Sequence, residues 1–206
     1  MPKGTFFNLP DEKRERITEA AIDEFAEYSY EGASITRIVD NANIAKGSFY
    51  QYFEDKKDLF KHIIDIIGEK KLMYMTRLLK DFEKLDFFQA FREMYAAGIK
   101  FAKDNPRLSK IGNSLIKGAD VKLMQEVLGE AIPKSNEFIK GMLLRGIQRG
   151  EIAPEIDADI VAYMLTELSI SISEYFIKEM KAEDDMEILE LADKMIFVIE
   201  NGIKKR

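Results

Sequence analysis

Hydrophobic positions recur with a helical period through most of the chain. Between Ser34 and Asn43 the apolar side chains fall at i, i+3, i+4 and i+7, which is the spacing of one helix face: Ile35, Ile38, Val39 and Ala42. Ser34 is a suitable N-cap for this short helix, and Asn43 can end it because asparagine tolerates left-handed backbone. We therefore predict a helix of about two turns, followed by a tight turn.

A second short helix is predicted from about Ala45, with a much longer one after it. Phe49, Tyr52 and Phe53 share one side of the second helix, which we assign to the core. Asp55 is a suitable N-cap for the long helix, whose period runs to about Leu79. Before these elements the pattern predicts a helix from Pro10 or Asp11 to about Tyr28, with residues 1–10 as a mobile arm.

The rest of the chain also has a helical period and no strand pattern. Helices are predicted over about 86–104, ended by Asn105-Pro106, then to about Ile116, over 120–150 with a kink or break at Pro133, over 157–180, and from 184 or 185 to about 203. Gly150 is expected to close the segment that precedes Asp157. The fold class is therefore all-α.

The outward face of the second short helix is small and polar. Gly47 and Gln51 point away from Phe49, with Ser48 and Tyr50 beside them. Glycine destabilises a helix by about 1 kcal/mol relative to alanine, so a helix that only covered a core would rarely carry it. A helix that approaches a DNA duplex benefits, because its backbone can come close. Two short helices joined by a tight turn are also the layout of a helix-turn-helix DNA-binding motif.

The order of residues in this region resembles the DNA-binding domain of TetR-family transcriptional regulators. The similarity rests on S-I-T-R-I-V-D-N-A followed by N-I-A-K-G-S-F-Y-Q-Y-F-E-D-K-K-D-L, within the first quarter of the chain, and a weaker one on R-G-I-Q-R-G-E-I from Arg145. Asn43 stands where the family usually has glycine, and Ala45 where serine is frequent.

The resemblance implies an N-terminal three-helix domain at 1–56 and a larger helical domain at 57–206 for effector binding and dimerisation. By the same resemblance Tyr50, Tyr52 and Lys56 match positions that hold DNA phosphates. Candidates on the groove side are Thr36, Arg37, Lys46, Gly47, Ser48 and Gln51, and Ser34 completes the expected DNA-binding set.

Composition argues against catalysis and against a metal centre. The chain of 206 residues has no cysteine and one histidine, which excludes thiolate chemistry and histidine-rich metal sites. We also find no phosphate-cradling glycine loop, so no catalytic residue, metal ligand or cofactor is predicted. No apolar run is long enough to span a bilayer and no signal peptide is evident, so a cytoplasmic, membrane-free protein is expected.

The net charge of −6 argues against nonspecific coating of nucleic acid. Few phosphate contacts per chain also imply that two chains bind together to reach useful affinity. The last two predicted helices are apolar on two sides, as helices shared with a partner are. We therefore predict a homodimer through 157–203, with these side chains at the interface: Leu168, Ile172, Tyr175, Phe176, Met195 and Ile199.

Aromatic and methionine side chains are frequent in the middle of the chain. They can simply fill a core, but TetR-like regulators hold a small-molecule pocket in this region. The residues assigned to such a pocket are Phe91, Met94, Tyr95, Met142 and Met164. The effector would then be small and mainly apolar, with one or two polar anchors, and methionines would let the site adapt to its shape.

The function expected from these features is a repressor that binds a palindromic operator on double-stranded DNA as a homodimer and is released by a small effector. The long helix from Asp55 is the expected lever between pocket and DNA. One alternative is a TetR-like protein with a non-transcriptional role through a protein partner, and another is a helical enzyme or carrier. If a small molecule releases the protein from operator DNA, the repressor is favoured over both alternatives. Operator sequence, effector identity, regulatory sign, regulated genes and the number of dimers per operator are not encoded in these patterns.

Overall fold

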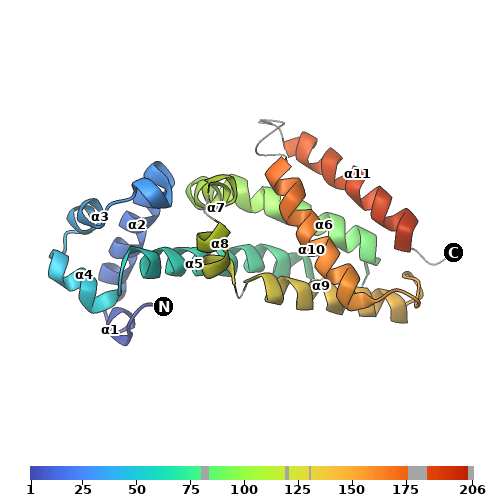
Figure 1. Cartoon of the computed structure of the whole chain (residues 1–206), viewed down its shortest axis with the longest axis horizontal. Helices are drawn as coiled ribbons and strands as arrows, with labels where there is room; N and C mark the ends of the chain where they lie inside the picture. The colour runs from blue at the N-terminus through green and yellow to red at the C-terminus, as the bar shows by residue number, and fades with distance from the viewer. Residues whose placement is uncertain (80–83, 119–120, 130, 176–184, 204–206) are drawn as a thin grey trace. The chain divides into compact units, whose positions relative to one another are not determined.

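The chain is mainly helical in the part that its computed structural model describes, residues 1–79, 84–118, 121–129, 131–175 and 185–203. No strand is found within these ranges, so the predicted all-α class is confirmed (Figure 1). None of the helices in them is long and apolar enough to cross a membrane. The chain divides into two compact units, which we call the head unit (Met1–Lys70 with Asn105–Val127) and the body unit (Lys71–Asp104 with Leu128–Arg206).

The head unit contains four complete helices, the beginning of a fifth, and two helices from later in the chain. Their bounds are α1 Gly4–Phe7, α2 Asp11–Gly32, α3 Ile35–Asn41, α4 Lys46–Tyr52, α5 Lys56–Leu79, α7 Pro106–Gly118 and α8 Val121–Leu128. Helix α5 passes from the head unit into the body unit. We predicted a boundary at residue 56 between a DNA-binding domain and a domain for effector binding and dimerisation. The division into compact units does not test this functional boundary, which stays a prediction.

Local sequence explains where these helices begin and end. Asp55 accepts a hydrogen bond from the Asp58 backbone N–H at 2.8 Å, which is the predicted cap of α5. Asn43 has φ 51°, as expected for the residue that ends the α3 segment. Helix α2 loses its helical geometry at Ser29 (φ 56°), one residue after the predicted end of the first helix.

The predicted mobile arm at residues 1–10 is wrong. Gly4–Phe7 form α1, and the Phe6 side chain is fully buried. Its ring lies 4.9 Å from that of Phe53 and 5.3 Å from that of His62, measured between centroids. One turn of helix shows no period, so the pattern could not indicate it. Burial of an aromatic side chain against distant residues holds this segment in place.

A small core fixes the short helices and includes Phe49 and Phe53, as predicted. Phe25, Ile38, Val39, Phe49 and Phe53 are each at most 2% exposed. Side chains from the start of α5 extend this core, and those exposed by 1% or less are Leu59, Phe60 and Ile63. The Phe25 and Phe60 rings lie 4.9 Å apart, so α5 packs directly against α2.

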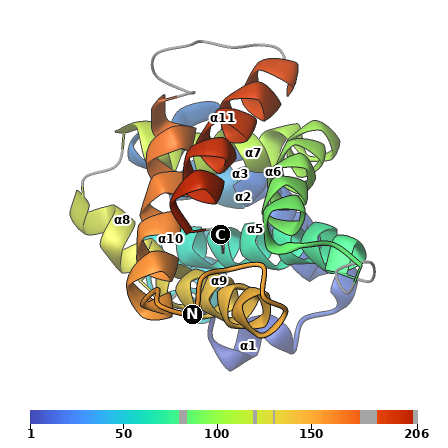
Figure 2. The same ribbon diagram turned by 90° about the vertical axis from the view of Figure 1, so that its right-hand side faces the viewer.

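The body unit contains the end of α5 and four further helices (Figure 2). These are α6 Phe87–Asp104, α9 Ala131–Gln148, α10 Ala158–Tyr175 and α11 Asp185–Ile203. These four helices supply most of the side chains of a second hydrophobic core. Asp157 accepts hydrogen bonds from the backbone N–H groups of Asp159 (3.0 Å) and Ile160 (3.1 Å), which caps α10 as predicted. Gly150 has φ +72°, the left-handed conformation expected after the end of α9.

Two of the predicted boundaries differ in detail. Pro133 lies in the first turn of α9 and not at a kink, because a missing N–H costs little there, and the interruption falls between Leu128 and Ala131. The helix predicted to run to residue 180 is described only as far as Tyr175, so the rest of that prediction lies outside the described residues.

Candidate nucleic-acid interface

Helix α4 exposes the polar face that its sequence predicts. Lys46, Gly47, Tyr50 and Gln51 are exposed, while Phe49 and Tyr52, at 0% and 6% exposure, turn inward. Ser48, which we placed on the groove side, is half-buried. The exposed set provides an ammonium, an amide and a phenol, the groups that donate to phosphates and to base edges.

Gly47 has no packing reason to be glycine. A Cβ added at this position would meet no atom within 4 Å, and the residue does not adopt a positive φ. The folded chain could therefore accept a larger side chain here. Packing within the chain therefore does not explain the glycine, whereas the approach of the α4 backbone to another molecule would.

The turn between α3 and α4 is held by backbone bonds and by one basic side chain. The Ile44 N–H donates to the Val39 carbonyl at 3.0 Å, and Arg16 Nε donates to the Ala42 carbonyl at 2.8 Å. Lys46 Nζ also lies 3.3 Å from Thr36 Oγ1, which links the first turns of the two helices. Thr36 itself is exposed. The relative position of α3 and α4 is thus determined by several contacts.

Arg37 is bound to a buried carboxylate, which the sequence did not reveal. Glu24 is 3% exposed, and its Oε1 accepts from Arg37 at 2.6 Å and from the Ser34 backbone N–H at 2.7 Å. The guanidinium also lies 4.1 Å from the Tyr28 ring centroid. Hydrogen bonding to Glu24 raises the pKa of Arg37. This arrangement braces α3 against α2, and the predicted groove role of Arg37 stays a prediction.

Lys56 is likewise engaged within the chain. Its ammonium donates to the carbonyls of Tyr30 (2.6 Å), Ala33 (3.0 Å) and Glu31 (3.3 Å), near the end of α2. A lysine has three donors, so these contacts compete with the phosphate contact predicted for it. That contact, like the one at the buried Tyr52, stays a prediction. Tyr50 is 46% exposed and free to reach outward.

Ser34 stands at the N-cap position of α3, but its hydroxyl makes no capping hydrogen bond. The Ser34 backbone N–H donates to the carboxylate of Glu24, ten positions earlier in the chain. The N-terminal residues Lys3 and Thr5 also contact α4, and the sequence patterns predicted neither contact. The only signal for them was the Phe6-Phe7 pair, which a mobile arm would rarely carry.

In the body unit, four of the five residues predicted to bind an effector lie together. Phe91 and Met142 belong to the buried core, and Met94 and Tyr95 pack against it. The Tyr95 hydroxyl donates to Ser169 Oγ at 2.8 Å, and burial raises the pKa of Tyr95. Met164 lies apart from them, 53% exposed on α10.

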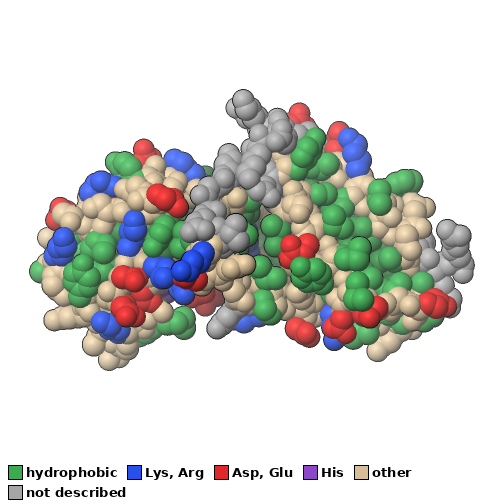
Figure 3. Space-filling model, in the orientation of Figure 1, with side chains coloured by type: hydrophobic (Ala, Val, Ile, Leu, Met, Phe, Trp, Pro, Cys, Tyr) green, Lys and Arg blue, Asp and Glu red, His purple; other side chains and the backbone are tan. Residues whose placement is uncertain are grey.

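The residues predicted for a dimer interface fall into two groups. Leu168 and Tyr175 are 40% and 53% exposed, whereas Met195 is 8% exposed, and Ile172 and Ile199 pack against the core of their own chain. Phe176 lies outside the described residues. Other large apolar side chains are also exposed on these two helices: Ile160, Tyr163 and Met164 on α10, and Phe197 and Val198 on α11. Hydrophobic side chains spread over the face on which α10 lies (Figure 3).

A short helix–turn–helix with an exposed polar second helix, set in a small helical core, defines the class of helix-turn-helix DNA-binding proteins. Comparison with known proteins gives the family. Residues 17–63 match the family model described as bacterial regulatory proteins, tetR family. The chain is 30% identical to a TetR family transcriptional regulator of Chloroflexus aurantiacus J-10-FL, with all of both chains covered and a TM-score of 0.63. The chain belongs to the TetR family of transcriptional regulators.

Two further relatives are similar over most of the chain. The probable acrEF/envCD operon repressor of Escherichia coli K12 is 26% identical over 155 residues, which is 74% of this chain and 70% of that protein. The transcriptional regulator FadR of Bacillus subtilis, solved in complex with stearoyl-CoA, shares the fold at 20% identity and a TM-score of 0.68, covering 92% and 98% of the two chains. The proteins compared here are named as regulators of transcription.

Proposed function

We propose that this chain is an effector-released repressor that binds a palindromic operator as a homodimer and inserts α4 of each copy into the major groove. The observation that carries this proposal is the exposed surface of α4 with Gly47 in open space. Two copies would present their α4 helices to successive major grooves, about 34–36 Å apart. The named repressor among the relatives supports the negative regulatory sign.

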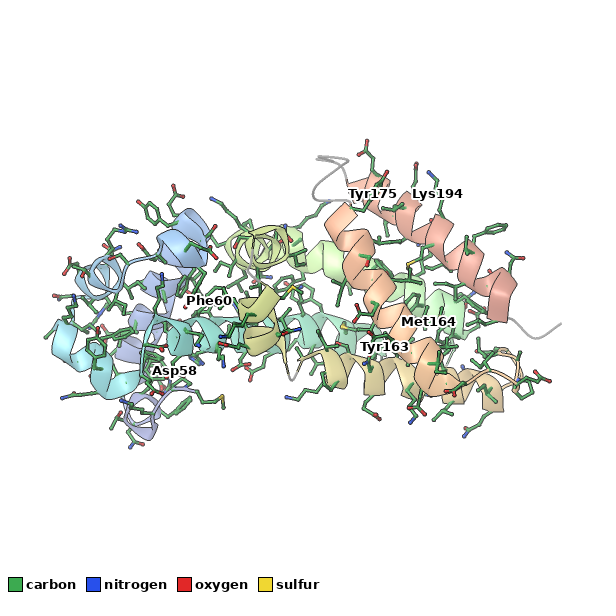
Figure 4. The ribbon with its side chains drawn as sticks, in the orientation of Figure 1. Asp58, Phe60, Tyr163, Met164, Tyr175 and Lys194 are labelled. Carbon is green, nitrogen blue, oxygen red and sulfur yellow. The ribbon has the colours of Figure 1, made fainter. Side chains whose placement is uncertain are left out.

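The homodimer is supported by the apolar face on α10. Tyr163, Met164 and Tyr175 project from this helix (Figure 4) and are each more than half exposed. Ile160 and Leu168 lie on the same side by helical spacing. An apolar stripe of this length in contact with water favours association, and a second copy is the partner that a two-fold operator requires.

The effector is proposed to be a molecule with a long acyl chain. Phe91, Met94 and Met142 supply an apolar environment, and the Tyr95–Ser169 hydrogen bond supplies a polar group that an effector could exchange for one of its own. The stearoyl-CoA complex of the FadR relative supports this class. Release of bound duplex by stearoyl-CoA, compared with coenzyme A alone, is the corresponding test.

Gly47→Ala tests the role of α4. Because the added methyl group meets nothing in the free chain, we expect unchanged or higher stability, by up to about 1 kcal/mol, since alanine favours the helix. On DNA the same methyl group would hold the backbone away from the groove, and we expect binding to fall about tenfold or more. Duplexes selected from random DNA by the unaltered protein serve as ligands in a fluorescence anisotropy titration.

Gly68→Ala is the matched control. Gly68 lies in α5, is exposed, and also has no atom within 4 Å of an added Cβ. We expect the same gain in stability there and no change in DNA affinity. Equal DNA affinity of the Gly47→Ala variant and the unaltered protein would remove α4 from the interface.

A further inference from the structure

The last turn of α4 has its backbone carbonyls satisfied mainly by residues at the start of the chain. A helix leaves its final four carbonyl groups without an intrahelical partner. In α4 these belong to residues 49–52. The Phe49 carbonyl accepts from the Phe53 N–H at 2.9 Å, within the continuing chain. The remaining three carbonyls each accept a hydrogen bond from residue 3 or residue 5.

Lys3 and Thr5 provide those three donors. Lys3 Nζ donates to the Tyr50 carbonyl at 2.8 Å, and the Lys3 backbone N–H donates to the Tyr52 carbonyl at 2.8 Å. The Thr5 hydroxyl donates to the Gln51 carbonyl. Lys3 also places a positive charge at the negative end of the helix dipole, which is the favourable sign. Together they form a C-cap that comes from some fifty residues away.

A buried aromatic side chain anchors this C-cap to the head unit. Phe6 is 0% exposed, with its ring centroid 4.9 Å from that of Phe53 and 6.3 Å from that of Tyr52. The terminal ammonium of Met1 pairs with Asp58 at the start of α5 (Figure 4). Residues 3 and 5 are therefore held over α4 by contacts on both sides of them.

Helix α4 has little else to stabilise its ends. It is only seven residues long, and its N-cap residue Ala45 makes no side-chain capping bond. Isolated helices of this length are unstable in water, because nucleation costs more than a few hydrogen bonds return. Burial of Phe49 and Tyr52 holds α4 on the head unit, and the donors bound to its C-terminus add to the order of the turn that carries Tyr50 and Gln51.

We propose that Lys3 and Thr5 are positioning residues for DNA recognition: by capping α4 they hold the Tyr50–Tyr52 turn in the geometry that fits the groove. This rests on the proposed function, in which α4 meets the DNA. The two residues act through α4, and Thr5 makes no contact with DNA of its own. Any partner or modification that displaces residues 3–6 then lowers operator affinity without an effector.

Two substitutions separate capping from direct phosphate contact. Lys3→Met removes the ammonium at nearly constant size, and Thr5→Val removes the hydroxyl at nearly constant shape. Matched controls are Lys70→Met, at an exposed lysine of α5, and Thr76→Val, whose hydroxyl donates to a carbonyl within α5 at 2.7 Å. The full chain is used, with any affinity tag at its C-terminus, so that the N-terminus stays as it is in the structure.

Amide hydrogen exchange of the DNA-free proteins and DNA affinity at several salt concentrations are measured together. We expect both variants to bind selected duplexes about three- to tenfold more weakly. Both should exchange the α4 amides faster while those of residues 17–26 in α2 stay as protected as before. The Thr5→Val variant should keep the salt dependence of the unaltered protein, since it loses no charge. Neither control substitution should change the amide exchange of α4.

Other results would overturn the proposal. If Lys3→Met flattens the salt dependence by about one phosphate contact while Thr5→Val changes nothing, Lys3 binds DNA directly and the cap has no role. If exchange rises equally in α2 and α4, the residues only stabilise the head unit. Should the unaltered protein select no duplex, the proposed function fails, and the exchange data alone decide whether residues 3 and 5 cap α4.

Discussion

His62 illustrates how a half-buried position changes the chemistry of a single side chain. Its ring lies 5.3 Å from the Phe6 ring and 6.3 Å from the Phe53 ring. Burial among these aromatic groups lowers the pKa of His62. The acidic groups of Asp58, Asp65 and Glu69 act in the opposite direction but less strongly, and the Met1 ammonium adds to the lowering.

This burial makes the stability of the head unit depend on pH. Well above pH 6.5 the imidazole is neutral in both folded and unfolded chains, so it contributes no pH dependence there. As the pH falls below 6.5, the unfolded chain binds a proton that the folded chain resists, and the free energy of unfolding falls. Between pH 6.5 and 5.5 we expect the loss from this group to be at most about 1.4 kcal/mol.

Urea unfolding of the protein and of a His62→Gln variant at pH 7.5 and 5.5 measures this contribution. Carboxylates titrate in both proteins, so the difference between the two pH responses belongs to His62. We expect the unaltered protein to lose more stability on acidification than the variant. Identical pH responses would show that His62 titrates alike in the folded and unfolded chains.

Residues that act locally could be predicted from the sequence, whereas the partners of long side chains could not. Asn43 and Asp55 act through their own backbone or through neighbours a few positions away, so spacing indicated them correctly. Arg37 and Lys56 were assigned to DNA from their position in a motif. Within the chain their charged groups bind Glu24 and the end of α2, partners 13 to 26 positions away that no periodicity reveals.

At the scale of elements, the joint between α2 and α3 depends on one carboxylate. Glu24 accepts from the Ser34 N–H and from Arg37, across the break at Ser29. Glu24→Gln keeps the shape but loses the charge and one acceptor oxygen. We expect it to lower the free energy of unfolding by about 1–3 kcal/mol, because hydrogen bonds to charged groups are the stronger ones and one buried donor is left with a weaker partner.

Glu27→Gln on the same helix is the control for this change. Glu27 is 67% exposed and lies 3.7 Å from Lys110, so its loss should change stability by less than about 1 kcal/mol. Denaturant unfolding of the two variants compares them directly. If both cost the same, Glu24 does not brace the joint.

Element prediction succeeded where amphipathic period and capping residues agreed and failed where neither applied. Helices α3, α4, α5 and α10 begin within a residue or two of their predicted starts. Helix α1 was missed because a single turn held by Phe6 has no period of its own. Long-range packing, which a single sequence does not display, decides such segments.

The oligomeric state belongs to the scale of the whole molecule. If the exposed face of α10 joins two copies, Leu168→Glu would bury a charge without a partner, and we expect dimer dissociation to be favoured by about 100-fold or more. Leu72→Glu on α5 is the control, since Leu72 is 53% exposed and lies outside the proposed interface. Sedimentation velocity distinguishes a dimer from a chain of 23.7 kDa. An unaltered protein that sediments as one chain at micromolar concentration would falsify the dimer.

Which segments of the chain belong to each unit could not be predicted from periodicity. Arg107 in α7 pairs with Glu19 at 2.8 Å and with Asp23, and Lys57 pairs with Glu126 in α8 at 2.6 Å. These ion pairs contribute to the contacts that place residues 105–127 with the first seventy residues. A helical pattern indicates where an element is, but not which charged neighbour it will find.

The burial of Leu59, Phe60 and Ile63 has a consequence for dissecting this protein. A polypeptide stopping at residue 56 would omit three side chains that are at most 1% exposed and would leave Phe25 facing water. Each such omission removes roughly 1.5–3 kcal/mol of hydrophobic stabilisation, and the three together are comparable with the whole margin of a small domain. The shortest autonomous DNA-binding piece must therefore reach at least Ile63, which is also where the segment matching the family model ends.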